Sequence, residues 1–319
     1  MNVMIMSISQ KVPMIKAVKN ALRRARPGAK LYGADTNASC LGQYVVDVFW
    51  LCPSLQDLTM DSFIGYCHAQ EISVVFPSRD GELLYFAEYR QQLEQAGITV
   101  MISDVDAVEL CLDKLRFYEQ MAKQGYPVIP TFAEFEDMAT SLHYKVGQYV
   151  VKERFGAGSV NVGIGLNPHE TKRHARKMVN PVFQPLIHGV EYSVDVFLTS
   201  TSKAIGALAR QRNWVMNGES QITTSVRYPE MEKLCQQIAE RFKFRGHVIF
   251  QIIVDEKKRQ HLIECNCRFG GASTLALAMG LDSFFWFLQE SGGAQINDLA
   301  FYRAVHEKML VRHAEDLIL

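Results

Sequence analysis

The sequence predicts two successive units, an α/β unit with a parallel sheet and then an α+β unit dominated by antiparallel strands. The first part of the chain alternates buried strands with helical stretches, which is the pattern of a parallel sheet covered by helices. From about residue 143 the chain changes to short strands that follow one another. Of the 319 residues, 48% are hydrophobic and 21% are charged, so the composition is that of a globular protein.

The first unit is expected to span residues 1–102. Apolar runs predict its strands, and apolar residues at helical spacing predict the helices between them. The strands are expected at 2–8, 30–35, 45–50, 71–78 and 98–103, and the helices from about 14 to 22, at 57–70 and at 81–96. Asp80 and Glu82 follow a buried strand, where α/β sheets tend to place ligands. They are candidates for contacting an amine, although acids that cap a helix are the simpler interpretation.

The second unit is expected to span residues 103–319. Short strands at 149–155 and 160–166 flank the glycine-rich stretch GAGS. A helix follows at about 168–179, and another at about 228–243 interrupts the later strands. Those strands are expected to be antiparallel, at 190–199, 203–210, 219–226, 247–254 and 260–267.

Charge and cysteine content exclude several classes of protein. Lys plus Arg and Asp plus Glu both number 34, and this zero net charge argues against a general nucleic-acid binder. The seven cysteines include no CxxC pair and no set of zinc ligands, which favours buried thiols in a reducing compartment. No basic leader and no long uncharged apolar window occur, so we expect a cytoplasmic protein that does not span a membrane.

A glycine-rich loop is the first candidate for ligand chemistry. In VVKERFGAGSVNVGIG, two strands flank a loop that contains Gly156, Gly158 and Ser159. Glycines let backbone N–H groups close around phosphate oxygens, and Lys152 on the preceding strand can add a positive charge. An ordinary glycine-rich hairpin is an equally good interpretation of this stretch alone.

The hairpin 250–271 is the second candidate. Glu264, Asn266 and Arg268 are spaced two residues apart, so an extended strand places all three on one face. An antiparallel partner strand can bring Gln251 beside Glu264. Carboxylate and amide oxygens suit Mg²⁺, and a guanidinium suits a phosphoryl group. The alternative is a solvated polar face on an edge hairpin.

Two arginines form the third candidate. Arg210 and Arg212 share one face of a predicted strand, and a guanidinium pair suits an anionic substrate or a phosphate. A surface ion pair is an equally plausible interpretation of these two arginines.

In this order, these motifs resemble the ATP-grasp superfamily. The resemblance is closest to the synthetase modules of carbamoyl-phosphate synthetase, biotin carboxylase and related carboxylate–amine ligases. LDK at 112–114 and QPLIHGVEYSVD at 184–195 add to the likeness. It covers nearly the whole chain, and it implies an N-terminal α/β domain at 1–102 and an ATP-grasp domain at 103–319. A mobile lid subdomain is implied at about 143–187.

The resemblance also implies a role for each matching residue. ATP phosphates would be contacted by Lys114, Lys152, Gly156, Gly158 and Ser159, adenine by Gln184, Pro185 and the N–H of Leu186, and ribose by Glu191. One or two Mg²⁺ ions, or Mn²⁺ in their place, would bind Gln251, Glu264 and Asn266. The catalytic residues would be Arg268, Arg210 and Lys152. Glu153 and Cys267 depart from prolines that are frequent in the family, which affects the expected loop geometry more than the ligands.

The implied activity is that of an ADP-forming, ATP- and Mg²⁺-dependent ligase. It would activate a carboxylate as an acyl-phosphate and join it to an amine, such as an amino acid. The partners would be ATP and small carboxylate and amine substrates, with homodimerisation left open. The length fits a small amino-acid or peptide-like ligase better than a biotin carboxylase or a complete carbamoyl-phosphate synthetase. A non-catalytic ATP-binding regulatory or partner subunit and a small-molecule kinase of the same fold are the alternatives.

Overall fold

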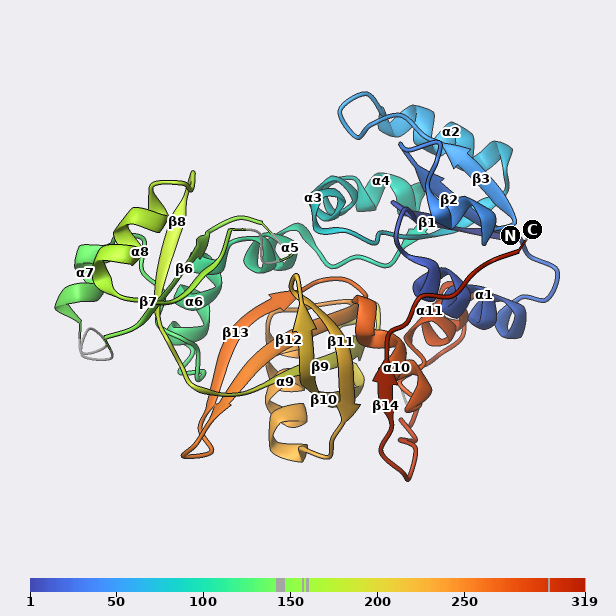
Figure 1. The fold of residues 1–319 in the computed structure, drawn as a ribbon. Coiled ribbons are helices and arrows are strands. Elements are labelled where there is room, and N and C mark those ends of the chain that lie inside the picture. The colour runs from blue at the N-terminus through green and yellow to red at the C-terminus, as the bar shows by residue number, and fades with distance from the viewer. Residues whose placement is uncertain (142–146, 157, 159–160, 298, 319) are drawn as a thin grey trace.

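A computed structural model describes residues 1–141, 147–156, 158, 161–297 and 299–318. The chain forms three units, which Figure 1 shows as a parallel sheet, a large antiparallel sheet and a small three-stranded sheet at the far end. The expected succession of a parallel α/β unit and an antiparallel α+β unit is therefore confirmed. Ser159, which was expected at the phosphates, lies outside the described residues.

The first unit contains a five-stranded parallel sheet in the order β3-β2-β1-β4-β5. Its strands are β1 (Asn2–Met6), β2 (Leu31–Asp35), β3 (Val48–Leu51), β4 (Ile72–Phe76) and β5 (Thr99–Val100). Chain order reverses at the boundary between β1 and β4, and parallel sheets place ligands beyond the carboxyl ends of strands at such a point.

Helices cover both faces of this sheet because the buried strands alternate their apolar side chains. Met4 and Met6 on β1 face a core that includes Phe63 and Phe86, whereas Val3 and Ile5 face a second core. The helices are α1 (Val12–Ala25), α2 (Met60–Ala69), α3 (Asp80–Glu88) and α4 (Arg90–Gln95), and a 3₁₀ turn spans Leu41–Tyr44. The single helix expected at 81–96 is divided at Tyr89 into α3 and α4.

The second unit is built on a six-stranded antiparallel sheet in the order β13-β12-β9-β10-β11-β14. Its strands are β9 (Gly189–Leu198), β10 (Ala204–Met216), β11 (Glu219–Ser225), β12 (Gly246–Asp255), β13 (Gln260–Asn266) and β14 (Met309–Val311). The helices of this unit are α5 (Val105–Leu112), α6 (Lys114–Lys123), α9 (Pro229–Arg241), α10 (Thr274–Ala278) and α11 (Ser283–Ser291). A 3₁₀ turn at Gly271–Ser273 precedes α10.

One hydrophobic core joins the two larger units. Val75 of the parallel sheet and Phe250 of the antiparallel sheet belong to the same buried cluster. Helices α5, α6 and α9 contribute Val108, Phe117 and Ile238 to it. Because the cluster is continuous, the edge of the parallel sheet is held beside the six-stranded sheet.

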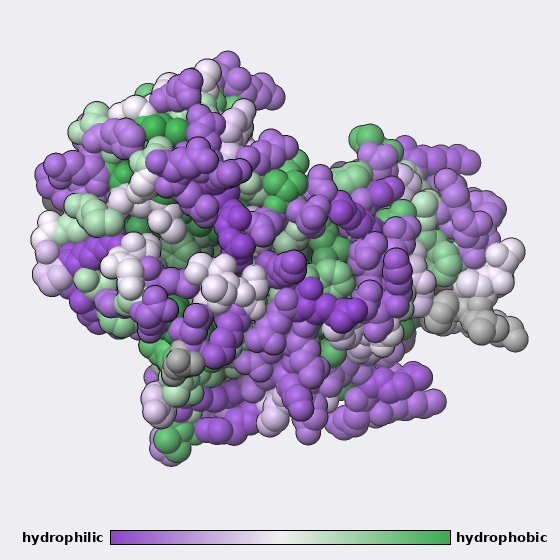
Figure 2. All heavy atoms as spheres, turned by 180° about the vertical axis from the view of Figure 1, so that it is seen from behind, coloured by the Kyte–Doolittle hydropathy of each residue, from purple (hydrophilic) through white to green (hydrophobic). Residues whose placement is uncertain are grey.

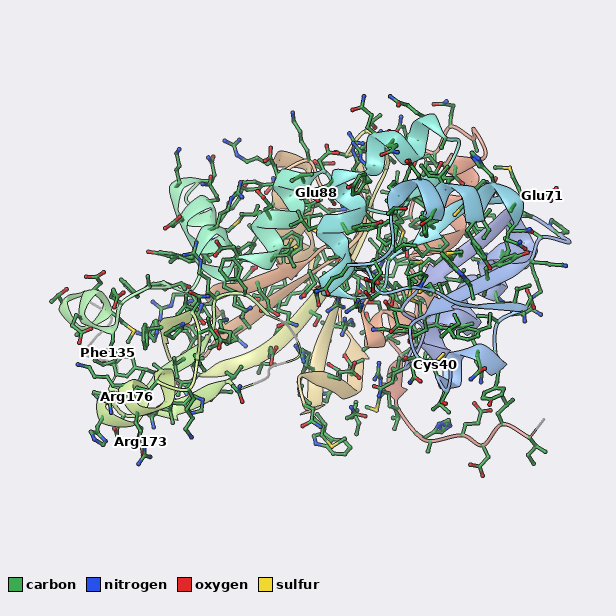
Figure 3. The ribbon with its side chains drawn as sticks, turned by 90° about the horizontal axis from the view of Figure 1, so that it is seen from above. Cys40, Glu71, Glu88, Phe135, Arg173 and Arg176 are labelled. Carbon is green, nitrogen blue, oxygen red and sulfur yellow. The ribbon has the colours of Figure 1, made fainter. Side chains whose placement is uncertain are left out.

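The third unit is the three-stranded sheet β7-β6-β8 with two short helices. Its elements are α7 (Phe135–Thr140), β6 (Tyr149–Glu153), β7 (Gly163–Leu166), α8 (Pro168–Ala175) and β8 (Pro181–Pro185). It has a small core of its own that includes Phe135 and Tyr149. Figure 3 shows Phe135, Arg173 and Arg176 at this end of the molecule, whereas Cys40 lies at the other end, beside the parallel sheet.

Both termini lie beside the parallel sheet (Figure 1), where Lys16 forms an ion pair with Glu315 at 2.8 Å. In the described part of the chain, no single helix is long and apolar enough to cross a membrane, although the bent pair 271–278 and 283–291 meets the length and composition criteria together.

Candidate functional site

One face of the six-stranded sheet carries a row of polar and charged side chains. Along β9, Val194 and Val196 point into the large core, so Ser193 and Asp195, which alternate with them, point to the opposite face. The neighbouring strands follow the same alternation. The polar face is formed by Glu191, Ser193 and Asp195 of β9, Arg210 and Arg212 of β10, Gln251 of β12, and Glu264 and Asn266 of β13.

A β-bulge places the polar residues of β13 in phase with this face. Gln251 pairs with Glu264, but the next residue, Ile252, pairs with Leu262, so Ile263 is the extra residue. The buried residues are consequently Leu262, Cys265 and Cys267 rather than Ile263. Without the bulge, strict alternation along β13 would not allow Leu262 and Cys265 to be buried on the same face.

Gln251, Glu264 and Asn266, the expected metal ligands, lie together as the sequence predicts. Gln251 is directly opposite Glu264, and Asn266 is opposite Ile249 on the same strand pair. With its amide nitrogen toward Glu264, Gln251 donates to Oε1 at 3.2 Å and accepts from Arg212 at 2.9 Å. No cationic side chain among the described residues pairs with Glu264.

The donor set fits a hard cation such as Mg²⁺. Glu264 is a partly buried carboxylate without a cationic partner among the described residues, and two amide side chains flank it. One carboxylate with few protein ligands suits Mg²⁺, which usually completes its shell with waters and substrate phosphates. No cluster of three or more His, Cys, Asp or Glu side chains occurs in the described ranges, so a zinc-type site does not fit there.

Lys152 provides a buried positive charge opposite this donor set. It lies on β6 and is 7% exposed, and its ammonium group makes neither a hydrogen bond nor an ion pair within the described part of the chain. Burial lowers the pKa of Lys152 to about 8, and the charge of Glu264 partly offsets that effect. An ammonium that is held without a counterion is suited to an anionic ligand.

Two glycines that follow Lys152 have positive φ angles. Gly156 and Gly158 adopt φ values of +130° and +73°, and L-amino acids other than glycine rarely adopt such angles. Lys114, at the start of α6, donates to the carbonyl of Gly156 at 2.7 Å. Lys114 and Lys152 therefore lie on either side of the same loop.

The segment expected to hold adenine requires one correction. The N–H of Leu186 donates to the carbonyl of Gln148 at 3.0 Å, so it is not free as the sequence analysis expected. The following N–H, that of Ile187, has no hydrogen bond among the described residues. The side chain of Gln184 is buried and donates to Thr131 at 2.7 Å. Pro185 ends β8 opposite Tyr149.

Glu191 and Arg212 form an ion pair on the polar face at 2.7 Å. Arg212 also donates to the carbonyl of Gly218 at 2.7 Å, which holds the tip of the β10–β11 hairpin over the face. Burial raises the pKa of Glu191, and the charge of Arg212 opposes the rise.

Arg210, which the sequence predicts to face a substrate, is instead buried in an ion pair with Asp195. It is 4% exposed, and its Nε donates to Asp195 at 2.7 Å. Asp195 also accepts hydrogen bonds from Ser273 and from His247, the latter at 3.0 Å. Burial alone would raise the pKa of Asp195, but Arg210 and His247 outweigh it and hold the pKa below its ordinary value. Ser283 contacts the other ring nitrogen of His247 at 3.0 Å.

Arg268 is positioned by a residue from the other unit. Asp80, the first residue of α3, forms a two-point ion pair with it at 2.9 and 2.6 Å. Glu82 points inward instead and caps α3 through the backbone N–H of Arg79 at 3.2 Å. The sequence interpretation of Glu82 as a capping acid is consistent with this contact, whereas Asp80 has a role that neither alternative anticipated.

The sequence did not indicate Ile187, the Asp195–His247 pair or the pairing of Asp80 with Arg268. Ile187 is an apolar residue whose contribution is its backbone, and no side-chain motif marks it. Asp80 and Arg268 are separated by 188 residues, and His247 and Asp195 come from different strands. Only the assembled fold brings these pairs together.

The parallel α/β unit, the antiparallel sheet with its polar face and the small three-stranded unit define the ATP-grasp class of fold. Residues 177–316 match the family described as ATP-grasp in the biosynthetic pathway with Ter operon, and residues 3–101 match the PylC-like N-terminal domain. The chain is an ATP-grasp protein with a PylC-like N-terminal domain. No curated protein matches the sequence.

Solved structures with the same fold include two biotin carboxylases. The biotin carboxylase domain of Hydrogenobacter thermophilus 2-oxoglutarate carboxylase, with MgADP and bicarbonate, has a TM-score of 0.77 and 16% identity, over 96% of this chain and 73% of that one. Biotin carboxylase from Campylobacter jejuni has a TM-score of 0.77 and 14% identity, over 97% and 74%. N5-carboxyaminoimidazole synthetase from Staphylococcus aureus has a TM-score of 0.68 and 14% identity, over 92% and 77%. These low identities establish a shared fold.

Proposed function

We propose that the protein is an ADP-forming ligase that uses ATP and Mg²⁺ to activate a carboxylate and join it to an amine. The observation that carries the proposal is the pair of Lys152 and Glu264. Their charges act on one another, yet each lacks a counterion among the described residues. Opposite charges held apart in this way are suited to a ligand that brings both signs, such as a nucleotide phosphate with its metal ion.

The nucleotide would lie between the three-stranded unit and the polar face. Lys152, Lys114 and the loop of Gly156 and Gly158 would contact its phosphates. The N–H of Ile187, which has no hydrogen bond among the described residues, replaces that of Leu186 as the proposed donor to the adenine edge. Glu191 would bind the ribose hydroxyls. The three-stranded unit would act as the lid, with the proposed boundaries at about 143–187, and the domain boundary at 102/103 is proposed with it.

Gln251, Glu264 and Asn266 would hold Mg²⁺. The bound ion would neutralise charge on the phosphate oxygens during transfer. Gln251 must turn its amide to present oxygen to the ion, and Arg212 is close enough to accompany that change.

The reaction would proceed in two displacements. A carboxylate oxygen attacks the γ-phosphorus of ATP, the bond to the β–γ bridging oxygen breaks, and ADP leaves with that electron pair. The amine nitrogen then attacks the acyl carbon, phosphate leaves with the electrons of the C–O bond, and the nitrogen loses a proton. Arg268, oriented by Asp80, would stabilise the charge on the transferred group.

Arg210 has a supporting position in this proposal. Its Nε is committed to Asp195, so a substrate contact would have to use its terminal nitrogens. The names of the structural neighbours add support, since they describe complexes with MgADP and bicarbonate or with ADP. The Hydrogenobacter structure is described as a domain dimer, and homodimerisation of this chain stays a prediction.

Replacing Glu264 with alanine tests the proposal. ADP release is measured with Mg²⁺ over a pool of amino acids, and Mg²⁺-dependent ATP binding is measured by calorimetry. We expect turnover to fall at least about a hundredfold, because metal-assisted charge stabilisation contributes several kcal/mol. Glu256→Ala, on the exposed turn of the same hairpin, is the matched control. Unchanged turnover in Glu264→Ala would refute the metal assignment.

Measuring ADP release and ATP binding also distinguishes the proposed ligase from the alternative, a non-catalytic ATP-binding subunit. Such a subunit would bind ATP and Mg²⁺ without releasing ADP across the pool. The two-point pairing of Arg268 with Asp80 favours the enzyme, because orienting a guanidinium near the metal ligands serves phosphoryl transfer.

A further inference from the structure

A cavity of about 370 Å³ lies at the carboxyl edge of the parallel sheet. Its wall is formed by the loops that follow β1, β2 and β3, by the start of α3, and by Glu219 from the β10–β11 hairpin. Lys11, Asp35 and Leu55 contribute a cation, an anion and an apolar surface. The volume lies in the range of small-molecule sites.

Lys11 contributes an unpartnered ammonium to this cavity. Lys11 is partly buried, and its ammonium group makes no hydrogen bond or ion pair with the residues that the structure describes. Burial is the main cause that lowers the pKa of Lys11, and the positive charge of Arg268 lowers it further, whereas the acids Glu219, Asp80 and Glu82 raise it. An anion bound against this ammonium would offset the cost of burying its charge.

Asp35 contributes a carboxylate that likewise has no counterion. It is 7% exposed and accepts hydrogen bonds from the backbone and hydroxyl of Ser9, at 2.8 and 2.9 Å, and from the backbone of Asn37 at 3.0 Å. These donors are neutral, and no cationic side chain in the described ranges pairs with Asp35. The cavity therefore has an unmatched positive group and an unmatched negative group.

We propose that this cavity binds the carboxylate substrate as a zwitterion, namely an α-amino acid. Its carboxylate faces Lys11, and its ammonium group faces Asp35. This inference rests on the proposed ligase function and deepens it, because the carboxylate held by Lys11 is the one presented for phosphorylation. Met6 and Leu55 line the same cavity and accommodate the side chain of the amino acid.

Equilibrium binding to the intact chain tests the inference without relying on turnover. Thermal shift and calorimetry are run with each of the proteinogenic L-amino acids and their D-enantiomers, first alone and then with a non-hydrolysable ATP analogue and Mg²⁺. We expect at least one amino acid to bind. Its amide and its N-acetyl derivative, which lack one charge each, are expected to bind at least about tenfold more weakly.

Three variants locate the site. Lys11→Met is expected to weaken binding of that amino acid at least about tenfold, and Lys11→Arg to restore most of it. Lys16→Met, at an exposed position of helix α1, which begins directly after Lys11, is expected to bind like the wild type. Binding that Lys11→Met leaves unchanged, or no binding under either condition, would overturn the inference. Binding without ADP release would contradict the ligase proposal and leave the site intact.

Discussion

Replacing Lys152 with methionine should increase the folding stability of the protein and lower its affinity for ATP. The structure keeps this ammonium 7% exposed with no counterion among the described residues. Its pKa falls from the ordinary 10.5 to about 8 because burial disfavours the charged form. Since each pKa unit corresponds to about 1.4 kcal/mol, the charged lysine costs about 3 kcal/mol of folding free energy at pH 7. Methionine has a similar length and carries no charge.

The stability that Lys152→Met gains over the wild type should depend on pH, and the direction of that dependence identifies the buried charge as the cause. Between about pH 8 and 10.5 the unfolded chain binds a proton at Lys152 that the folded chain has lost. Stability of the wild type therefore rises with pH in this window relative to that of the variant. The difference between them should be largest at pH 7 and should shrink as pH approaches 10.

Urea unfolding of both proteins at pH 7 and pH 9.5 measures this difference, and ATP titration measures the functional cost. We expect ATP affinity to fall at least about tenfold, as for the loss of a charge-assisted contact. Lys177→Met, at an exposed position of the same unit, is the control for removing a lysine. A variant that is no more stable than the wild type, or a difference that stays constant with pH, would refute the reasoning.

Two further predictions concern the residues that hold the site in place. Asp195→Asn should destabilise the protein by about 3 kcal/mol at pH 7, because Arg210 would keep a buried charge without its partner. A urea unfolding midpoint equal to that of the wild type would contradict this prediction. The Asp195 contribution is present above about pH 4 and should be lost as pH falls below it, since the folded pKa is the lower one. Asp80→Asn should reduce substrate-dependent ADP release about tenfold or more while ATP affinity stays near that of the wild type, because Arg268 loses its orientation. A parallel loss of ATP affinity would contradict that positioning role.

The arrangement of the elements could be predicted because it depends on local patterns. Alternating strands and helices indicated the parallel sheet, and the hairpin 250–271 indicated that Gln251 faces Glu264. The glycines at 156 and 158 do adopt angles that favour glycine. Each of these inferences uses residues that are close in sequence, or strands that are joined by a short turn.

The partners of the charged residues could not be predicted, because they are chosen by packing between distant segments. The sequence predicts that Arg268 and Arg210 act on the substrate, whereas in the structure Asp80 forms an ion pair with Arg268 and Asp195 forms one with Arg210. The bulge at Ile263 and the occupied N–H of Leu186 also follow from the fold of neighbouring strands. Figure 2 shows hydrophobic residues scattered among hydrophilic ones on the rear face, so the hydropathy of that face does not mark a site.

The Mg²⁺ dependence of ATP binding, measured by calorimetry on the wild type and on Glu264→Ala, tests the central claim most directly. The claim is that nucleotide phosphates and their metal ion bind between Lys152 and Glu264. Mg²⁺ should increase the ATP affinity of the wild type and should have little effect on Glu264→Ala, while Glu256→Ala behaves like the wild type. An equal increase by Mg²⁺ in the wild type and Glu264→Ala, or no ATP binding by the wild type, would contradict the claim.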